Sequence, residues 1–217
     1  MARRLRGAAG ILKIGSQLFT AEGPRAVAKI AGLGFGVFLD LKFHDIPNTV
    51  AGSVAAAAEL PRIRLLTLHT LGGADMMRAA AQAVAGKKGR PALLGVTILT
   101  SHDAASLRGV GISGTPGSRA LALAKLAKKA GLDGVVASAH EARAIRRACG
   151  PGFLIVVPGV RPASAAANDQ SRVATPAEAI RAGADYLVIG RPITGAADPR
   201  RAALVIGEEI ASASRRS

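Results

Sequence analysis

The sequence predicts an α/β fold in which a parallel β-sheet is covered by helices. Short apolar runs alternate with longer, alanine-rich stretches along all 217 residues, and such alternation is typical of repeated strand–helix units. Capping residues mark the ends of several helical stretches. No linker or shift in composition divides the chain, so we expect one domain that spans residues 1–217 and buries a sizeable core.

Seven apolar runs are candidates for strands. They lie at 10–14, 37–43, 65–69, 92–99, 134–138, 153–158 and 186–190. Helical stretches lie between them at 23–31, 50–60, 74–85, 118–130, 139–149 and 176–182. An open doubly wound sheet can use seven strands, whereas a closed (β/α)8 barrel needs one more, so the count alone does not choose between them.

Helix boundaries carry recognisable signals. Thr175, Pro176 and Glu178 suit the N-cap, N1 and N3 positions of a helix that starts with a capping box. Gly131 and Gly183 follow helical runs, at the position where glycine commonly ends a helix.

The chain is strongly basic. It has 29 lysines and arginines against 14 aspartates and glutamates, a net charge of +15, which favours anionic partners. Nucleic acid is one alternative. However, the dense basic groups at 3–6, 87–90 and 146–147 are not interleaved with the aromatic residues on which single-strand binders stack bases. We therefore expect an anionic small molecule and no nucleic-acid or membrane partner.

The single cysteine, Cys149, excludes a disulfide framework and a cysteine zinc site within the chain. We expect it to be a buried thiol rather than a nucleophile. No apolar run reaches membrane-spanning length, and the apolar residues before Lys13 are too few for a signal peptide. These features predict a cytoplasmic protein.

A charged pair interrupts the second predicted strand. Because side chains alternate between the two faces of a strand, Leu39, Leu41 and Phe43 are expected to pack under helices. Asp40 and Lys42 then face the other way, near the strand's carboxyl end. Charges are costly to bury in a parallel sheet unless they are paired. This pair indicates a catalytic centre, with a structural salt bridge as the alternative.

The residues that follow extend the pair into a longer motif. Residues 40–50 read Asp-Leu-Lys-Phe-His-Asp-Ile-Pro-Asn-Thr-Val, which closely resembles the signature of the orotidine 5'-phosphate decarboxylase family. Segments similar to other parts of that family occur in order at 12–15, 19–24, 96–101, 131–136, 158–162, 168–170 and 185–194. The resemblance implies a TIM (β/α)8 barrel of the ribulose-phosphate-binding type. It also implies a lyase that converts orotidine 5'-phosphate to uridine 5'-phosphate, the last step of pyrimidine biosynthesis, without a metal or cofactor.

The resemblance also implies roles for individual residues. The family's Lys–Asp–Lys–Asp array is matched by Lys13, Asp40, Lys42 and Asp45, and the last aspartate of the array acts in the partner's site of a homodimer. Asp40 would lie near the substrate carboxylate, and Lys42 would stabilise the carbanion and deliver a proton. Further substrate-binding positions are Ile46, Asn48, Thr49, Thr100, Arg161, Gln170, Gly190 and Arg191. Gln170 follows an Ala/Ser-rich stretch, 163–169, that resembles a lid.

One part of the family pattern is missing. Residues 1–10 look like the end of the family's first helix, so we expect the first strand, with its ribose-binding aspartate, to be absent from this chain. That absence explains the count of seven. The start of the sequence is either internal to a longer gene product, which we favour, or a real truncation. We expect the 217-residue form to be unstable or weakly active.

Other functional interpretations are weaker. A sugar-phosphate decarboxylase or aldolase-like relative would share the Asp-x-Lys-x-x-Asp core but would need magnesium. Residues 109–114 fit the dinucleotide pattern G-x-G-x-x-G but do not join a strand to its helix. His44, His69, His102 and His140 lack metal-ligand spacing, although His44 lies within the motif and is a candidate to line the site.

Overall fold

In the computed structural model, seven parallel strands form one sheet in the order in which they occur along the chain. The structure describes residues 1–162 and 174–215. The strands are β1 (Ile11–Gly15), β2 (Gly36–Phe43), β3 (Ile63–His69), β4 (Ala92–Val96), β5 (Gly134–Val136), β6 (Leu154–Pro158) and β7 (Tyr186–Val188). All seven predicted strands are confirmed. Several end earlier than predicted, because the residues after them already belong to loops.

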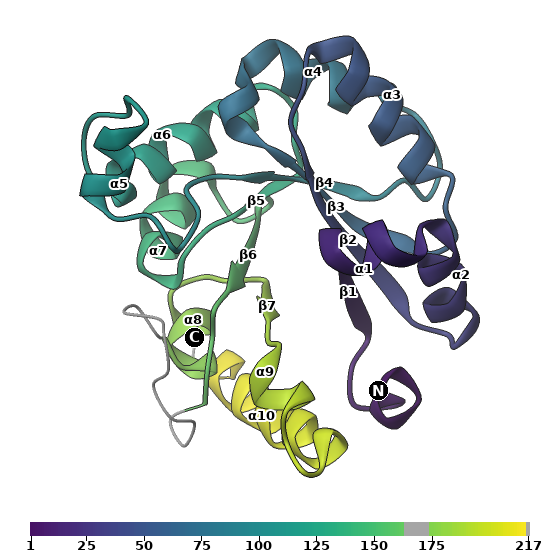
Figure 1. Ribbon diagram of the computed structural model, residues 1–217. Coiled ribbons are helices and arrows are strands. Elements are labelled where there is room, and N and C mark those ends of the chain that lie inside the picture. The colour runs from purple at the N-terminus through teal and green to yellow at the C-terminus, as the bar shows by residue number, and fades with distance from the viewer. Residues whose placement is uncertain (163–173, 216–217) are drawn as a thin grey trace.

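Helices connect successive strands (Figure 1). They are α1 (Ser16–Glu22), α2 (Pro24–Gly32), α3 (Pro47–Ala58), α4 (Gly73–Ala83), α5 (Ala104–Gly109), α6 (Pro116–Lys129), α7 (Ala139–Cys149), α8 (Pro176–Arg181), α9 (Arg191–Thr194) and α10 (Pro199–Ser214), with 3-10 turns at Ala2–Leu5 and Thr70–Gly72. The six predicted helical stretches correspond to α2, α3, α4, α6, α7 and α8. In the described part of the chain, no helix is long and apolar enough to cross a bilayer.

The strand order identifies a barrel rather than a doubly wound sheet. A doubly wound sheet reverses its strand order at a switch point, whereas here every neighbour in the sheet is also the next strand in sequence. Right-handed crossovers then place the connecting helices on one face, and the sheet curls with its other face inside. Between the edge strands β1 and β7 lies an apolar hollow of about 710 Å³, bordered also by α10.

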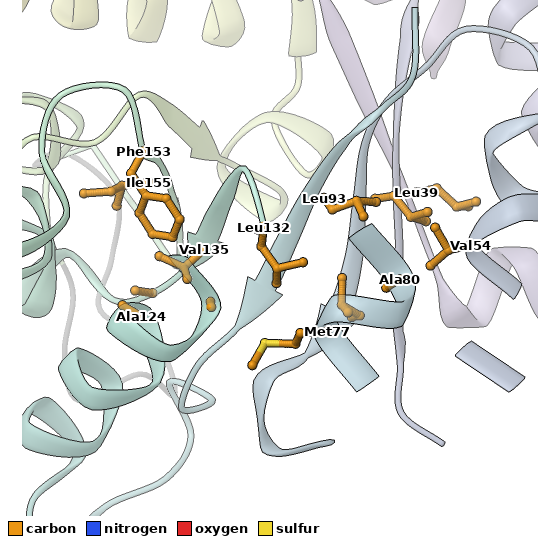
Figure 2. Packing of buried hydrophobic residues seen from close by; sticks show 14 of the residues in the cluster. Leu39, Val54, Met77, Ala80, Leu93, Ala124, Leu132, Val135, Phe153 and Ile155 are labelled. Carbon is orange, nitrogen blue, oxygen red and sulfur yellow. The ribbon is translucent and has the colours of Figure 1, made fainter. Parts of the chain in front are cut away.

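Two layers of apolar side chains follow from the alternation of the strands. Leu39 faces outward and packs with residues of α3 and α4, among them Val54, Met77 and Ala80 (Figure 2). Its neighbour Phe38 faces inward and belongs to a small cluster with Leu65, Leu94 and Val156. The inner layer fills the middle of the barrel and leaves room at the carboxyl ends of the strands.

Two aspartates fix the opposite, amino-terminal end of the sheet. The Asp133 carboxylate accepts a hydrogen bond from the Leu93 backbone N–H at 2.7 Å and forms an ion pair with Arg90. Asp185 accepts the Ile155 N–H in the same way, also at 2.7 Å. Each aspartate therefore satisfies a backbone donor of a neighbouring strand. Barrel ends of this kind serve stability rather than catalysis.

Arg146 is a structural clamp at this end. Its guanidinium donates hydrogen bonds to the backbone carbonyls of Gly150, Pro151, Phe153 and Gly183, and it pairs with the Asp185 carboxylate. It lies within one of the dense basic groups noted in the sequence, but its charge is used inside the fold.

Cys149 at the end of α7 is buried in the main core. Burial raises the pKa of its thiol, which disfavours the nucleophilic thiolate. The prediction of a buried thiol is confirmed.

Candidate active site

Three charged side chains meet at the carboxyl ends of β1 and β2. The Lys42 Nζ lies 2.9 Å from each carboxylate oxygen of Asp40, and the Lys13 Nζ lies 3.2 Å from Oδ2. The parallel register places Gly15 of β1 beside Asp40, which brings Lys13 within reach. The carboxylate is buried, whereas the two lysine side chains are 37% and 38% exposed. Asp40 and Lys42, which were expected on the same face of the strand, are therefore in direct contact.

Asp40 is held in its ionised form. Burial by itself raises the pKa of this carboxyl, but hydrogen bonding and charge from Lys42 act in the opposite direction. The charge of Lys13 and a hydrogen bond from Thr67 also lower it, and the net pKa lies below the ordinary value of 3.8. At neutral pH the site therefore presents one carboxylate flanked by two ammonium groups.

The backbone of β2 is irregular at Lys42. Its φ of 52° lies in the left-handed region, which costs a residue with a side chain about 1–3 kcal/mol. Pairing with β3 shifts here: Leu39 opposes Leu66, but Phe43 opposes Leu68. The prediction that Leu39, Leu41 and Phe43 pack on the same side is confirmed, because all three lie with the main core. Regular alternation did not predict the register shift, in which extra β2 residues bulge between the two pairs.

A residue that the sequence analysis missed, Thr67, connects these features. Its Oγ1 accepts a hydrogen bond from the Lys42 N–H at 2.9 Å and donates one to Asp40 Oδ1 at 3.0 Å. Thr67 is fully buried in β3. The available signal was a single hydroxyl between two leucines in the strand.

The charged cluster opens into a hollow of about 280 Å³. Besides Lys13, Asp40 and Lys42, its walls are Phe38, Val96, Ile98, Leu99, Thr100, Ser101, Val136, Ala137, Pro158 and Val188. These residues come from the interior and the carboxyl ends of several strands. The hollow combines charge on one side with apolar surface on the other, which suits a small anion carrying a flat apolar ring. Thr100 therefore lines the same hollow as the charged cluster.

The residues after β2 form a separate, exposed group. Asp45, Ile46, Asn48 and Thr49 are exposed, and Ile46 remains 66% accessible. The Asp45 carboxylate accepts a hydrogen bond from the Ile46 N–H at 2.7 Å. Among the described residues that line the 280 Å³ hollow, none comes from this group.

The predicted phosphate-binding residues follow the last two strands. Gly190 precedes α9, where Arg191 is exposed at the first helical position. A side chain at position 190 would meet open space, so a ligand can approach this backbone. Arg161 follows β6 and is buried, with 8% of its surface accessible. Gln170 and the 163–169 stretch lie outside the described residues.

None of the four histidines and none of the glycines at 109–114 lines the 280 Å³ hollow. The His44 and His69 rings stack with centroids 5.4 Å apart, and burial, followed by nearby positive charge, lowers the pKa of His69. In the ranges 1–162 and 174–215, no three His, Cys, Asp or Glu side chains are grouped to hold a metal ion. The glycines at 109–114 lie at the end of α5 and in the loop before α6 rather than after a strand.

Comparisons with known proteins agree with this geometry. The model of a family described as "Orotidine 5'-phosphate decarboxylase / HUMPS family" matches residues 1–206. Two proteins named orotidine 5'-phosphate decarboxylase are similar to the chain. The one from Halorhodospira halophila is 55% identical over 202 residues, covering 93% of this chain and 85% of the relative. The one from Geobacter sulfurreducens is 56% identical over 212 residues, covering 96% and 88%.

Solved structures show the same fold. The crystal structure of orotidine 5'-phosphate decarboxylase from Lactobacillus acidophilus superimposes with a TM-score of 0.80 at 39% identity, covering 91% of this chain and 85% of the other. The enzyme of that name from Pyrococcus horikoshii gives a TM-score of 0.76 at 23% identity, covering 97% and 91%, and supports the fold alone.

Proposed function

The chain belongs to the orotidine 5'-phosphate decarboxylase family, and from this premise we propose that it converts orotidine 5'-phosphate to uridine 5'-phosphate and carbon dioxide. One observation carries the proposal: a buried, ionised Asp40 lies between the ammonium groups of Lys13 and Lys42, beside a hollow with apolar walls. That arrangement suits decarboxylation at a pyrimidine carbon, in which the substrate carboxylate is destabilised and the negative charge that develops on the ring carbon is then stabilised.

Asp40 opposes the substrate carboxylate. Two negative charges about 4 Å apart repel by about 4 kcal/mol at an effective dielectric near 20. The repulsion disappears when carbon dioxide leaves, because the carbon–carbon bond breaks and its electron pair stays on the ring carbon. Asp40 thus raises the energy of the bound substrate relative to the transition state.

Lys42 completes the reaction. Its ammonium group stabilises the negative charge that develops on the ring carbon. It then transfers a proton to that carbon, giving uridine 5'-phosphate, and regains a proton from solvent. Lys13 contacts Oδ2 of Asp40 at 3.2 Å and keeps the carboxylate oriented while Lys42 moves toward the substrate.

The remaining substrate contacts are assigned by position. Thr100 lies in the wall of the hollow, where it suits a contact with the base. The backbone of Gly190 and the guanidinium of Arg191 receive the phosphate, as the loops after the last strands commonly do in barrels. Arg161 and Gln170 contact the nucleotide, with 163–169 as the lid.

The protein acts as a homodimer of single-domain subunits, 1–217, in the cytoplasm. The exposed group formed by Asp45, Ile46, Asn48 and Thr49 supports this, because none of these residues lines the hollow of its own subunit and their exposure allows them to enter the partner's site. Ile46, at 66% accessible, offers an apolar contact for such an interface.

Turnover by the wild type and the Lys42→Ala variant tests the function. We expect the wild type to release carbon dioxide from orotidine 5'-phosphate and Lys42→Ala to lose this activity while still binding uridine 5'-phosphate. Lys129→Ala, at the far end of α6, is the control. Turnover that a chelator abolishes would favour the magnesium-dependent relatives. RNA binding with a steep salt dependence and no turnover would favour the nucleic-acid interpretation.

A further inference from the structure

We propose that Thr67 is a positioning residue whose single hydroxyl sets both the carboxylate of Asp40 and the backbone of Lys42 for the reaction. The proposal rests on the function proposed above. Thr67 lies on β3 and touches both groups from the neighbouring strand, so it acts on the substrate only through them.

The direction of each hydrogen bond is fixed by chemistry. An ionised carboxylate only accepts, so the Thr67 hydroxyl must donate its one proton to Asp40 Oδ1, at 3.0 Å. A backbone N–H only donates, so a lone pair of the same oxygen receives the Lys42 N–H, at 2.9 Å. The hydroxyl therefore has one arrangement that satisfies both partners, and it links their positions.

The second of these bonds supports the left-handed backbone of Lys42. Where the β2–β3 pairing shifts between Leu39 and Phe43, the regular ladder is interrupted. Lys42 there adopts a φ of 52°, a conformation that persists only when its surroundings hold it. The Thr67 oxygen receives the Lys42 N–H in place of a strand carbonyl, and the side chain of Lys42 reaches back to both oxygens of Asp40.

The surroundings of Thr67 make it a firm support. It is fully buried between Leu66 and Leu68, which are also fully buried. A β-branched side chain on a strand has few allowed rotamers, so its oxygen stays in place when Lys42 moves. Valine at this position would keep the shape and lose the hydroxyl. Serine would keep the hydroxyl and lose only the methyl group.

A purely structural role for Thr67 would predict a different outcome, in which losing the hydroxyl lowers stability but leaves kcat unchanged. Thr70, the first residue of the 3-10 turn that follows β3, is also fully buried, and its hydroxyl donates to the Val96 carbonyl at 2.7 Å. It touches none of the three charged residues in the described contacts. Thr70→Val is therefore the matched control for the loss of a buried threonine hydroxyl.

The proposal is tested by steady-state kinetics and thermal unfolding of three variants, Thr67→Val, Thr67→Ser and Thr70→Val. We expect Thr67→Val to lower kcat about 10- to 100-fold, the range of a hydrogen bond to a charged group, with KM changed less than about threefold. Thr67→Ser should restore kcat to within about threefold of wild type, and Thr70→Val should leave kcat unchanged at a similar loss of stability. A folded Thr67→Val with wild-type kcat, or an equal loss of kcat in Thr70→Val, would overturn it.

Two further measurements keep the proposal separate from folding and from the proposed function. If Thr67→Val does not fold, Thr67→Cys supplies a thiol of similar size that is a weak donor, and wild-type kcat in that variant would overturn the proposal. If the wild type itself does not turn over orotidine 5'-phosphate, the proposed function fails. A crystal structure of the Thr67 variant then decides the inference: an unchanged contact between Lys42 Nζ and Asp40, with unchanged φ at Lys42, contradicts it.

Discussion

Replacing Asp40 by asparagine separates two effects that act in opposite directions. The change keeps the size of the side chain and removes its charge. Lys42 and Lys13, now within about 3 Å of a carboxylate, would lose their common partner. A substrate carboxylate bound beside them would then meet two unpaired ammonium groups and no anion.

The magnitude follows from Coulomb's law. The repulsion removed is about 4 kcal/mol for charges about 4 Å apart at an effective dielectric near 20, which corresponds to a loss in kcat of about a thousandfold. Substrate binding should not weaken, because the two freed ammonium groups attract the substrate carboxylate. We therefore expect a large fall in kcat with an unchanged or lower KM, the signature of lost ground-state destabilisation.

Steady-state assays of uridine 5'-phosphate formation test this reasoning. Substrate affinity is measured separately by equilibrium binding to Lys42→Ala and to the double variant Asp40→Asn/Lys42→Ala. Asp75→Asn is the control, because Asp75 is a largely exposed partner of Arg78 outside the site. A folded Asp40→Asn variant that keeps its kcat and only raises KM would refute the role given to Asp40, since it would make this carboxylate a binding group.

Three other predictions concern stability, pH and assembly. Arg146→Ala should lower the free energy of unfolding by about 3 kcal/mol, because buried carbonyls and Asp185 lose their donor. Arg147→Ala, at an exposed position, should change the free energy of unfolding measured by urea titration by no more than about 0.5 kcal/mol. Because the pKa of Asp40 is lowered, its stabilising effect is complete above the ordinary value of 3.8 and is lost as the pH falls through the lowered pKa. The difference in the free energy of unfolding between the wild type and Asp40→Asn should therefore be constant near neutral pH and shrink in acid. A difference that stays constant down to the acid transition would contradict this prediction. Mixed Lys42→Ala and Asp45→Ala subunits should regain activity, and no recovery after verified subunit exchange would argue against shared sites.

The fold could be predicted to the extent that it depends on local pattern. Seven apolar runs gave the seven strands, and alternation placed Asp40 on the side of the sheet opposite to Leu39. The capping box at Thr175 forms as expected. The helix α9, only four residues long, escaped prediction because so short a segment carries no periodicity, whereas the sixteen-residue α10 was missed despite its length.

The details of the candidate site depend on contacts between strands, which local pattern does not reveal. The left-handed backbone of Lys42 and its hydrogen bond to the Thr67 hydroxyl occur where the β2–β3 register shifts. Without the family resemblance, Arg161 looks like a surface residue, yet it is buried, and its backbone N–H donates a hydrogen bond to the Ala174 carbonyl. The expectation that the 217-residue form is weakly active stays a prediction.

The most direct test of the central claim is to incubate the purified chain with orotidine 5'-phosphate in deuterated water and to analyse both products. We expect carbon dioxide and uridine 5'-phosphate in equal amounts, with deuterium on the ring carbon that lost the carboxylate, because Lys42 delivers a proton exchanged with solvent. Folded protein that binds uridine 5'-phosphate but forms none from orotidine 5'-phosphate would contradict the account.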